Sequence, residues 1–255
     1  MFNIDLFEKN LKTEKIGKKN YYYASTCSTN NDIWNIFKKN KKAGIVVIAN
    51  EQNGGRGRGN NKWYSKKNKS LICSFLIKQK FSNEQLGLHA ILVPLGIING
   101  IKETIGKNLK LKWPNDIIYN NKKIGGVLIE SKNIDNTIYL NVGFGLNVNE
   151  HKNDFPDKIK NIASSLKIIT NYDIQREILL SNIINCIDQL LMNNNNNKVI
   201  VKDWLKHCVH INKNINVNYN NNILNAKFIN INNNGQAILN YNNKELIYDG
   251  EILNI

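Results

Sequence analysis

The chain has 255 residues, 42% of them hydrophobic, which is enough for one large domain with a substantial core, or for a large domain plus a small one. Lys and Arg outnumber Asp and Glu by 35 to 20, a formal charge of +15, but most of the excess is Lys beside Asn, so charge alone does not identify a nucleic-acid partner. No apolar run approaches the ~20 residues of a membrane span, and the start lacks a secretory signal, so we expect an intracellular protein with no membrane partner, cytoplasmic unless imported into an organelle.

The first third of the chain predicts a short helix followed by two buried strands. Apolar residues recur at helical spacing in STNNDIWNIFKK, with Ser28 or Thr29 placed as the N-cap. The stretches GIVVIAN and SLICSFLIK are apolar and rich in β-branched residues, and each predicts a buried strand. Between them lies NGGRGRGNN, residues 53–61, which therefore joins two strands of one core.

The middle of the chain alternates between helical and strand patterns. Residues 84–106 predict a long helix, although Pro94 could interrupt it. The stretches LKLKW, DIIY, KIGGVLIES and TIYLNVGFGLNVN predict a block of strands, in which Asn120 and Asn121 suit a tight hairpin turn. Helical periodicity returns at residues 173–191 and 198–207. The pattern predicts an α/β domain built on a mixed sheet.

The composition changes after about Asn212 to short alternating strands separated by Asn or Gly turns, which predicts a small, barrel-like β module. We place the boundary near residues 209–212, giving domains 1–210 and 211–255. Just before it, His207, Cys208 and His210 resemble metal ligands, but no second ligand group follows at finger-like spacing. We expect no metal held by the protein alone, and we expect the scattered cysteines to be buried, reduced thiols.

The glycine-arginine stretch allows two interpretations. RGG tracts that grip RNA are usually repeated in disordered sequence, whereas this one occurs once between predicted strands. A constrained loop is favoured, in which Gly55 and Gly57 let backbone N–H groups approach an anionic ligand. Arg56 and Arg58 add charge-assisted hydrogen bonds to carboxylate or phosphate oxygens.

Three later motifs also indicate a ligand pocket. KWPND, residues 112–116, leaves Asn115 and Asp116 at a strand edge, where they can face a pocket. In KKIGGVLIE, Lys123 stands before paired glycines, which mark a close approach of ligand or backbone. GFGLN, residues 143–147, repeats that pattern.

The order of these motifs, from STN through GRGRG with a following Trp, KWPND and K-x-G-G-V-L-x-E to G-x-G-x-N, resembles the biotin protein ligase family from about residue 20 to the C-terminus. FPDKIKNIASSL and the final β module extend the match. The resemblance implies an α/β (α+β) fold, with a mixed-sheet catalytic domain of the biotin/lipoate ligase type and a small SH3-like β-barrel. The ~20 residues ahead of the match are too few for the winged helix by which some relatives act as repressors, so no DNA partner is expected.

The resemblance further implies a ligase of the biotin–[acetyl-CoA-carboxylase] type. The carboxylate of biotin would attack the α-phosphorus of ATP, releasing pyrophosphate and forming biotinyl-5′-AMP, and Mg²⁺ would accompany the ATP. A lysine of a biotin carboxyl carrier domain, part of a biotin-dependent carboxylase, would then take the biotin and release AMP. The enzyme would be a monomer or a homodimer.

The family's pattern assigns roles to residues of this chain. It makes Lys123, Arg56 and Arg58 catalytic, Lys123 at the α-phosphate and the arginines in a loop that closes over the adenylate. Biotin contacts are implied at Ser28, Thr29, Asn30, Gln52, Gly55, Arg56, Gly57, Arg58, Lys123, Gly126 and Gly143. ATP contacts are implied at Arg58, Trp63, Asn115, Asp116, Lys123 and Asn147.

One motif departs from the family, and two alternatives remain. Many relatives read GRGR-x-G-R-x-W, whereas this chain has Gly59, Asn60 and Asn61 before Lys62 and the tryptophan, which affects how tightly the loop holds the adenylate. Lipoate or octanoate attachment enzymes share the implied fold and a comparable lysine, but lack the combination of KWPND and GRGRG. An RNA-binding protein would use the basic surface and the glycine-arginine tract.

Overall fold

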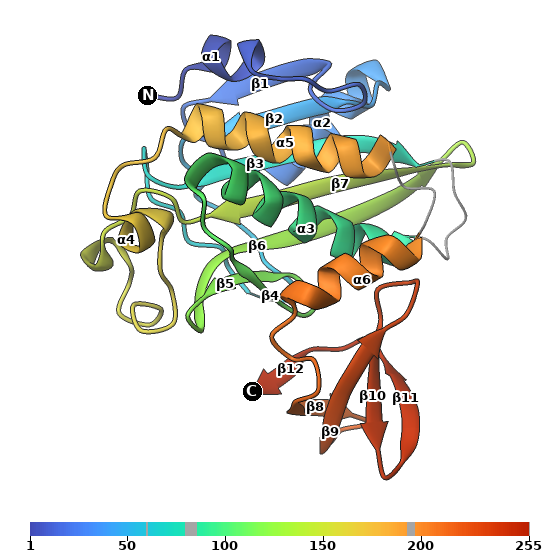
Figure 1. Ribbon diagram of the computed structural model, residues 1–255. Coiled ribbons are helices and arrows are strands. Elements are labelled where there is room, and N and C mark those ends of the chain that lie inside the picture. The colour runs from blue at the N-terminus through green and yellow to red at the C-terminus, as the bar shows by residue number, and fades with distance from the viewer. Residues whose placement is uncertain (60, 80–85, 193–196, 255) are drawn as a thin grey trace.

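A computed structural model describes residues 1–59, 61–79, 86–192 and 197–254 (Figure 1). In these ranges a mixed sheet carries helices on both faces. Its strands, in spatial order, are β1 Lys19–Tyr23, β2 Ile45–Ala49, β3 Leu71–Gln79, β7 Thr137–Leu146, β6 Lys122–Ile134, β5 Asp116–Tyr119 and β4 Lys110–Lys112. Only β1 and β2 pair in parallel, and the other neighbours are antiparallel. The predicted mixed sheet is confirmed.

Helices fill a separate core on each side of this sheet. Ile33, Trp34 and Phe37 of one helix pack with Val47 and Leu76 on one face, while the larger core lies on the other face (Figure 1). Both faces of β2 are therefore covered, and all of its residues are buried. The described helices are α1 Ile4–Lys9, α2 Thr29–Asn40, α3 Leu86–Ile105, α4 Leu166–Thr170, α5 Arg176–Met192 and α6 Asn197–His207.

Helix α3 is the predicted long helix, and Pro94 lies inside it. The first two residues of the predicted range, Glu84 and Gln85, lie outside the described residues. By length and composition Gly87–Ile105 is apolar enough to cross a membrane, but 67% of its most apolar window is buried inside the protein. A Cβ on Gly100 would lie 2.5 Å from Cα of Ile183, so α3 and α5 pack closely there. Core packing accounts for the apolar composition of α3.

The hairpin turns explain part of the abundance of asparagine. Asn120 and Asn121 take the left-handed conformation, with φ of 46° and 60°, and join β5 to β6 as predicted. The pair Asn220 and Asn221 and the pair Asn242 and Asn243 have positive φ at equivalent turns. Asparagine tolerates this conformation better than most side chains, because its short amide can bond to nearby backbone.

The C-terminal module is an antiparallel sheet, as predicted. Its strands, in spatial order, are β11 Lys244–Tyr248, β10 Ala237–Tyr241, β9 Asn222–Ile231, β8 Asn214–Tyr219 and β12 Ile252–Asn254. Within the described ranges β11 and β12 do not pair with each other, so the predicted SH3-like barrel is not closed by hydrogen bonds. The proposed domain boundary, 210/211, lies between the end of α6 and the start of β8 and stays a prediction.

Several contacts attach this module to the large domain, and Trp113 and Gly87 make two of them. The indole of Trp113 donates to the carbonyl of Gly235 at 2.9 Å. Gly87 packs so closely against the backbone of Asn234 that a Cβ at position 87 would overlap the Asn234 carbonyl oxygen. His210 is fully buried near this junction against Phe228, and burial lowers its pKa to about 4. His210 is thus packed as a neutral side chain, and the described residues hold no group of three or more His, Cys, Asp or Glu suited to a metal.

The cysteines only partly match the expectation. All four are free thiols, and Cys73, Cys186 and Cys208 are buried. Cys27 is exposed, in contrast to the prediction, because it lies in the loop before α2, where its carbonyl accepts a hydrogen bond from Gly54 N at 2.8 Å.

Candidate active site

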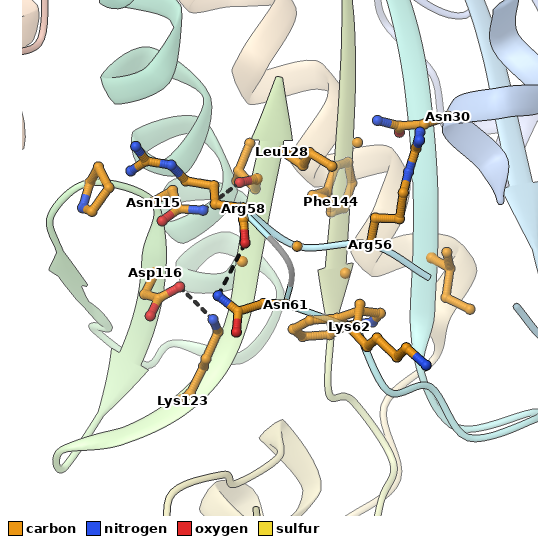
Figure 2. A pocket seen from close by; sticks show the side chains of 18 of the residues that line it. Asn30, Arg56, Arg58, Asn61, Lys62, Asn115, Asp116, Lys123, Leu128 and Phe144 are labelled. Carbon is orange, nitrogen blue, oxygen red and sulfur yellow. Dashed lines mark hydrogen bonds and ion pairs between the residues drawn. The ribbon is translucent and has the colours of Figure 1, made fainter. Parts of the chain in front are cut away.

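A cavity of about 200 Å³ lies where the start of α2, the glycine-arginine loop and strands β5, β6 and β7 meet (Figure 2). It brings together motifs that are far apart in the sequence. The predicted site residues that line it are Ser28, Thr29, Asn30, Gln52, Arg56, Gly57, Arg58, Trp63, Asn115, Asp116, Lys123, Gly126 and Gly143.

One end of the cavity is a network of uncharged polar groups. The Thr29 backbone N–H donates to Gln52 Oε1 at 2.9 Å, and its hydroxyl shares a 2.6 Å hydrogen bond with Ser74. Ser74 in turn donates to Asn30 Oδ1 at 2.6 Å. This fixes the orientation of the Asn30 amide and leaves its buried Nδ2 without a partner among the described residues. A buried donor of this kind is suited to a ligand carbonyl.

Ser28 is the N-cap residue of α2, as predicted. Its side chain, however, makes no capping hydrogen bond. Because Ser28 is buried and lines the cavity, its hydroxyl lies where a ligand can contact it.

Two glycines of β7 lie directly beneath side chains of other elements, which leave no space for a Cβ. A methyl group on Gly143 would overlap the side-chain amide of Asn30, and one on Gly145 would overlap the indole of Trp63. By contrast, a Cβ on Gly126 would lie 3.4 Å from Cε of Lys123, an ordinary contact. The first two glycines therefore make room for protein side chains of the site itself.

The glycine-arginine loop is a hairpin whose stem is ordered by backbone contacts. Trp63 N donates to Gly55 O at 3.0 Å, and Gly57 N donates to Asn61 O at 2.7 Å. The departure from the family pattern falls at the tip, where Asn60 lies outside the described residues and the Asn61 side chain donates to Arg58 O at 3.1 Å. The Asn61 side chain therefore supports the tip of the hairpin.

The two arginines of the hairpin point in different directions. Arg56 points toward the start of α2, while Arg58 extends toward Asn115 (Figure 2). The Arg56 guanidinium donates to Asn31 Oδ1 at 2.9 Å and to Glu130 Oε1 at 2.8 Å. Arg56 is thus engaged with the protein, whereas Arg58 remains available at the mouth of the cavity.

The cationic end of the cavity is formed by Lys123 beside the KWPND turn. Its Nζ lies 2.6 Å from Asp116 Oδ1 and 6.0 Å from the centroid of the Trp63 ring (Figure 2). The Asn115 amide donates to Val127 O at 2.6 Å, and Val127 N donates back to Asn115 O at 3.1 Å. The turn is therefore tied to β6, close to the lysine.

Two predicted site residues do not line the cavity. Gly55 lies in the hairpin stem, where a Cβ would be 2.5 Å from Nε2 of Gln52. Asn147 is buried and donates to Ser164 O at 3.0 Å and to Lys123 O at 3.4 Å. In this structure its amide supports the backbone of the lysine, and its contact with ATP stays a prediction.

Sequence reasoning also missed part of the lining. Several missed residues are direct neighbours of predicted motif residues, and a wider reading of the same motifs would have included them. Two others, Glu251 and Ile252, come from the C-terminal module, far in the sequence from the other lining residues. The missed lining residues are Asn61, Lys62, Ile72, Lys112, Trp113, Pro114, Val127, Leu128, Phe144, Gly145, Glu251 and Ile252.

The carboxyl group of Glu150 is buried beside Ser70, at the end of the loop that joins the hairpin to β3. Glu150 is 1% exposed, and Ser70 donates to its Oε1 at 2.5 Å. Burial raises the pKa of Glu150 to about 7 against the opposing effect of the Ser70 hydrogen bond. Ser70 also accepts from Lys66 N at 2.7 Å, so this carboxyl helps to hold the end of the loop.

The cavity thus combines an uncharged hydrogen-bonding end with a cationic end. The first suits a neutral polar head group, and the second suits carboxylate or phosphate oxygens. The hairpin between them carries Arg58, which can reach an anion at the mouth.

Comparisons with known proteins identify relatives of this chain. A profile of the Biotin/lipoate A/B protein ligase family matches residues 22–149. The bifunctional ligase/repressor BirA of Bacillus subtilis is 31% identical over 180 residues, covering 70% of this chain and 55% of that protein. The human biotin–protein ligase is 31% identical over 155 residues, covering 58% of this chain and 21% of that protein. The chain therefore spans little more than half the length of the first relative, and less of the second.

Solved structures extend the similarity to almost the whole chain. The biotin protein ligase of Aquifex aeolicus, in complex with biotin and ATP, has a TM-score of 0.78 and 26% identity, covering 92% of this chain and 98% of that one. The biotin protein ligase of Leishmania major, in complex with biotinyl-5-AMP, has a TM-score of 0.63 and 21% identity, covering 94% and 99%, and so shares the fold. The profile match covers half of the sequence and includes the motifs that line the cavity, and the chain belongs to the biotin/lipoate A/B protein ligase family.

Proposed function

We propose that this chain is an ATP-dependent biotin protein ligase. The observation that carries the proposal is the cavity itself, in which the buried Asn30 amide at one end and Lys123 at the other are covered by one glycine-rich hairpin. Biotin has a matching shape, with a neutral ureido ring at one end and a carboxylate at the other. A relative with the same fold and 26% identity over 92% of this chain was solved with biotin and ATP.

In the first half-reaction, a carboxylate oxygen of biotin attacks the α-phosphorus of ATP. A new P–O bond forms, the bond to the β-phosphate oxygen breaks, and pyrophosphate leaves with the electron pair. Negative charge accumulates on the phosphoryl oxygens, so the Lys123 ammonium is proposed to stabilise the transition state more than the bound substrates. Its present partner, Asp116, would then be released to the solvent side or to a cation.

In the second half-reaction, a neutral lysine amine of a carrier domain attacks the carbonyl carbon of biotinyl-5′-AMP. The C–O bond to the phosphate breaks, AMP leaves, and the amine loses a proton as the amide forms. The mixed anhydride is reactive toward water, so the hairpin is proposed to close over it, with Arg58 contacting the phosphate.

Mg²⁺ is proposed to enter with ATP, where it would neutralise charge on the triphosphate. Mg²⁺ generally takes one or two carboxylates together with substrate phosphates and water. The carboxylates that line the cavity in the described residues are Asp116 and Glu251, and Asp116 lies beside Lys123. The residues present therefore fit an ion held mainly by the nucleotide.

The test is incubation of the full chain with labelled biotin, ATP and a biotin carrier domain. We expect label on the carrier lysine, none without ATP, and none on a carrier whose lysine is replaced by arginine. Lipoate and octanoate, offered in place of biotin, distinguish the related attachment activities of the family. Transfer of either in preference to biotin would refute the substrate assignment.

A salt titration separates the RNA-binding alternative. Binding of RNA through phosphates weakens steeply with salt, whereas binding of biotin should barely change. Absence of biotin transfer together with salt-sensitive RNA binding would favour that alternative.

A further inference from the structure

We infer that Glu130 is a positioning residue that holds the stem of the glycine-arginine hairpin through Arg56, and that this contact maintains the closed state in which Arg58 retains the adenylate. The inference rests on the proposed function for the identity of the adenylate. The inference gives the two arginines of the motif different roles: Arg56 anchors the stem of the hairpin, and Arg58 contacts the adenylate.

Glu130 lies on β6, directly opposite Asn141 of β7. Its Oε2 accepts from the indole of Trp34 at 3.2 Å and from the Asn141 amide at 3.4 Å. Its Oε1 accepts from Arg56 at 2.8 Å. Because two donors of the large domain fix the carboxylate, Glu130 presents a defined acceptor to the hairpin.

Arg56 is located at the point of the hairpin where an anchor has most effect. It forms the bridge to Lys62 that closes the stem, just before the tip, of which Gly57 to Gly59 and Asn61 are described. A guanidinium bound to both Asn31 and Glu130 restrains the direction in which that stem leaves the sheet. The tip carries Arg58, so the direction of the stem sets where Arg58 can reach.

The same network reaches the polar end of the cavity. The Asn141 amide that contacts Glu130 also donates to the Asn30 backbone carbonyl at 2.8 Å, and Asn141 is fully buried. Asn31, the second partner of Arg56, follows Asn30 in the first turn of α2. The hairpin stem is thus linked through Glu130 and Asn141 to the backbone of Asn30.

The Arg56–Glu130 pair is suited to a hinge because it is not deeply buried. The side chains of Arg56 and Glu130 are 46% and 29% exposed. Exposed pairs contribute little to global stability, so loss of this pair should leave the fold intact while changing a local opening equilibrium by about two- to fivefold.

The experiment uses Glu130→Gln, which keeps the shape and removes the charge, and Asp173→Asn as a matched control. Asp173 forms a 2.8 Å pair with Lys167 outside the cavity lining. The first readout is the rate at which biotinyl-5′-AMP escapes from the enzyme. It is measured after one turnover as the adenylate that passes a filter that retains the protein. The second is tryptic cleavage after Arg58 and Lys62 without ligand, sites that both variants retain.

Glu130→Gln is expected to raise both rates by about two- to fivefold, with an unchanged melting temperature and unchanged release of pyrophosphate at saturating substrates. In an Arg56→Gln background it should add nothing, because Glu130 acts through Arg56. Wild-type rates in Glu130→Gln, an undiminished effect in the Arg56→Gln background, or the same effect in Asp173→Asn would each overturn the inference.

The tryptic readout needs no adenylate, so the two proposals fail separately. If the wild-type chain forms no biotinyl-5′-AMP, the proposed function fails, while faster cleavage in Glu130→Gln still supports the hairpin anchor. If the adenylate forms but neither rate changes in Glu130→Gln, the anchor fails and the ligase assignment stands.

Discussion

Replacing Lys123 by alanine should separate activation of biotin from binding of biotin. Lys123 Nζ lies 2.6 Å from Asp116, and its side chain is 39% exposed, so alanine leaves Asp116 with access to water and should not disturb the fold. The ammonium is expected to act mainly on charge that develops during attack on the α-phosphorus. Removal of one such donor typically lowers the rate by about 10²- to 10³-fold. The affinity for biotin should change little, because the Asn30 end of the cavity is untouched.

Two measurements on the same preparation test this expectation. Release of pyrophosphate in a single turnover reports activation, and calorimetric titration with biotin reports binding. Lys122→Ala is the matched control, since Lys122 is the exposed neighbour at the start of β6 and does not line the cavity. Pyrophosphate release at the original rate in Lys123→Ala would refute the assignment, and Lys112, which also lines the cavity, would be the next lysine to replace.

Arg58, Gly143 and Glu150 each offer a substitution with its own readout. Arg58→Ala should let biotinyl-5′-AMP escape while pyrophosphate still forms, seen as biotin on lysines of a bystander protein; labelling equal to wild type would contradict the closing role. Gly143→Ala should weaken biotin binding by about tenfold or more in calorimetry, because its methyl group displaces the Asn30 amide. Burial raises the pKa of Glu150 from 4.5 to about 7, so the folded protein holds a proton that the unfolded chain releases. The free energy of unfolding should therefore fall by up to about 3 kcal/mol as pH rises through this window, and Glu150→Gln should flatten that dependence in denaturant titrations; an unchanged profile would show that Glu150 does not titrate there.

Features set by local physics were predictable from the sequence. The hairpin at Asn120 and Asn121 follows from the ease with which asparagine takes positive φ, and the helix start near Thr29 follows from apolar spacing. The pocket at KWPND and Lys123 was indicated because glycines and turn residues gathered near one lysine. In each case the relevant contacts join residues close in sequence.

Features set by long-range pairing were not predictable. The partner of Arg56 depends on the register of β6 against β7, which places Glu130 opposite Asn141, and a shift of one residue would turn Glu130 to the other face. The hydrogen bond from the Asn147 amide to the carbonyl of Ser164 likewise joins segments that no local pattern relates, and the predicted contact of Asn147 with ATP stays a prediction. The approach of Glu251 depends on how the C-terminal module packs against the large domain, which is a long-range contact.

The two arginines of the hairpin look alike in the sequence but have different surroundings in the structure. In the sequence, Arg56 and Arg58 are equivalent cations flanked by glycines, and both were predicted to contact the ligand. In the structure, Arg56 meets an acceptor fixed by Trp34 and Asn141, so its charge is already balanced by the protein. An anion entering the cavity would have to compete with Glu130 for Arg56 and with Asp116 for Lys123, whereas the Arg58 side chain has no ion pair among the described residues. Of the two arginines, Arg58 is therefore the one expected to respond to a bound phosphate, and Arg56 orders the loop without needing to touch the ligand.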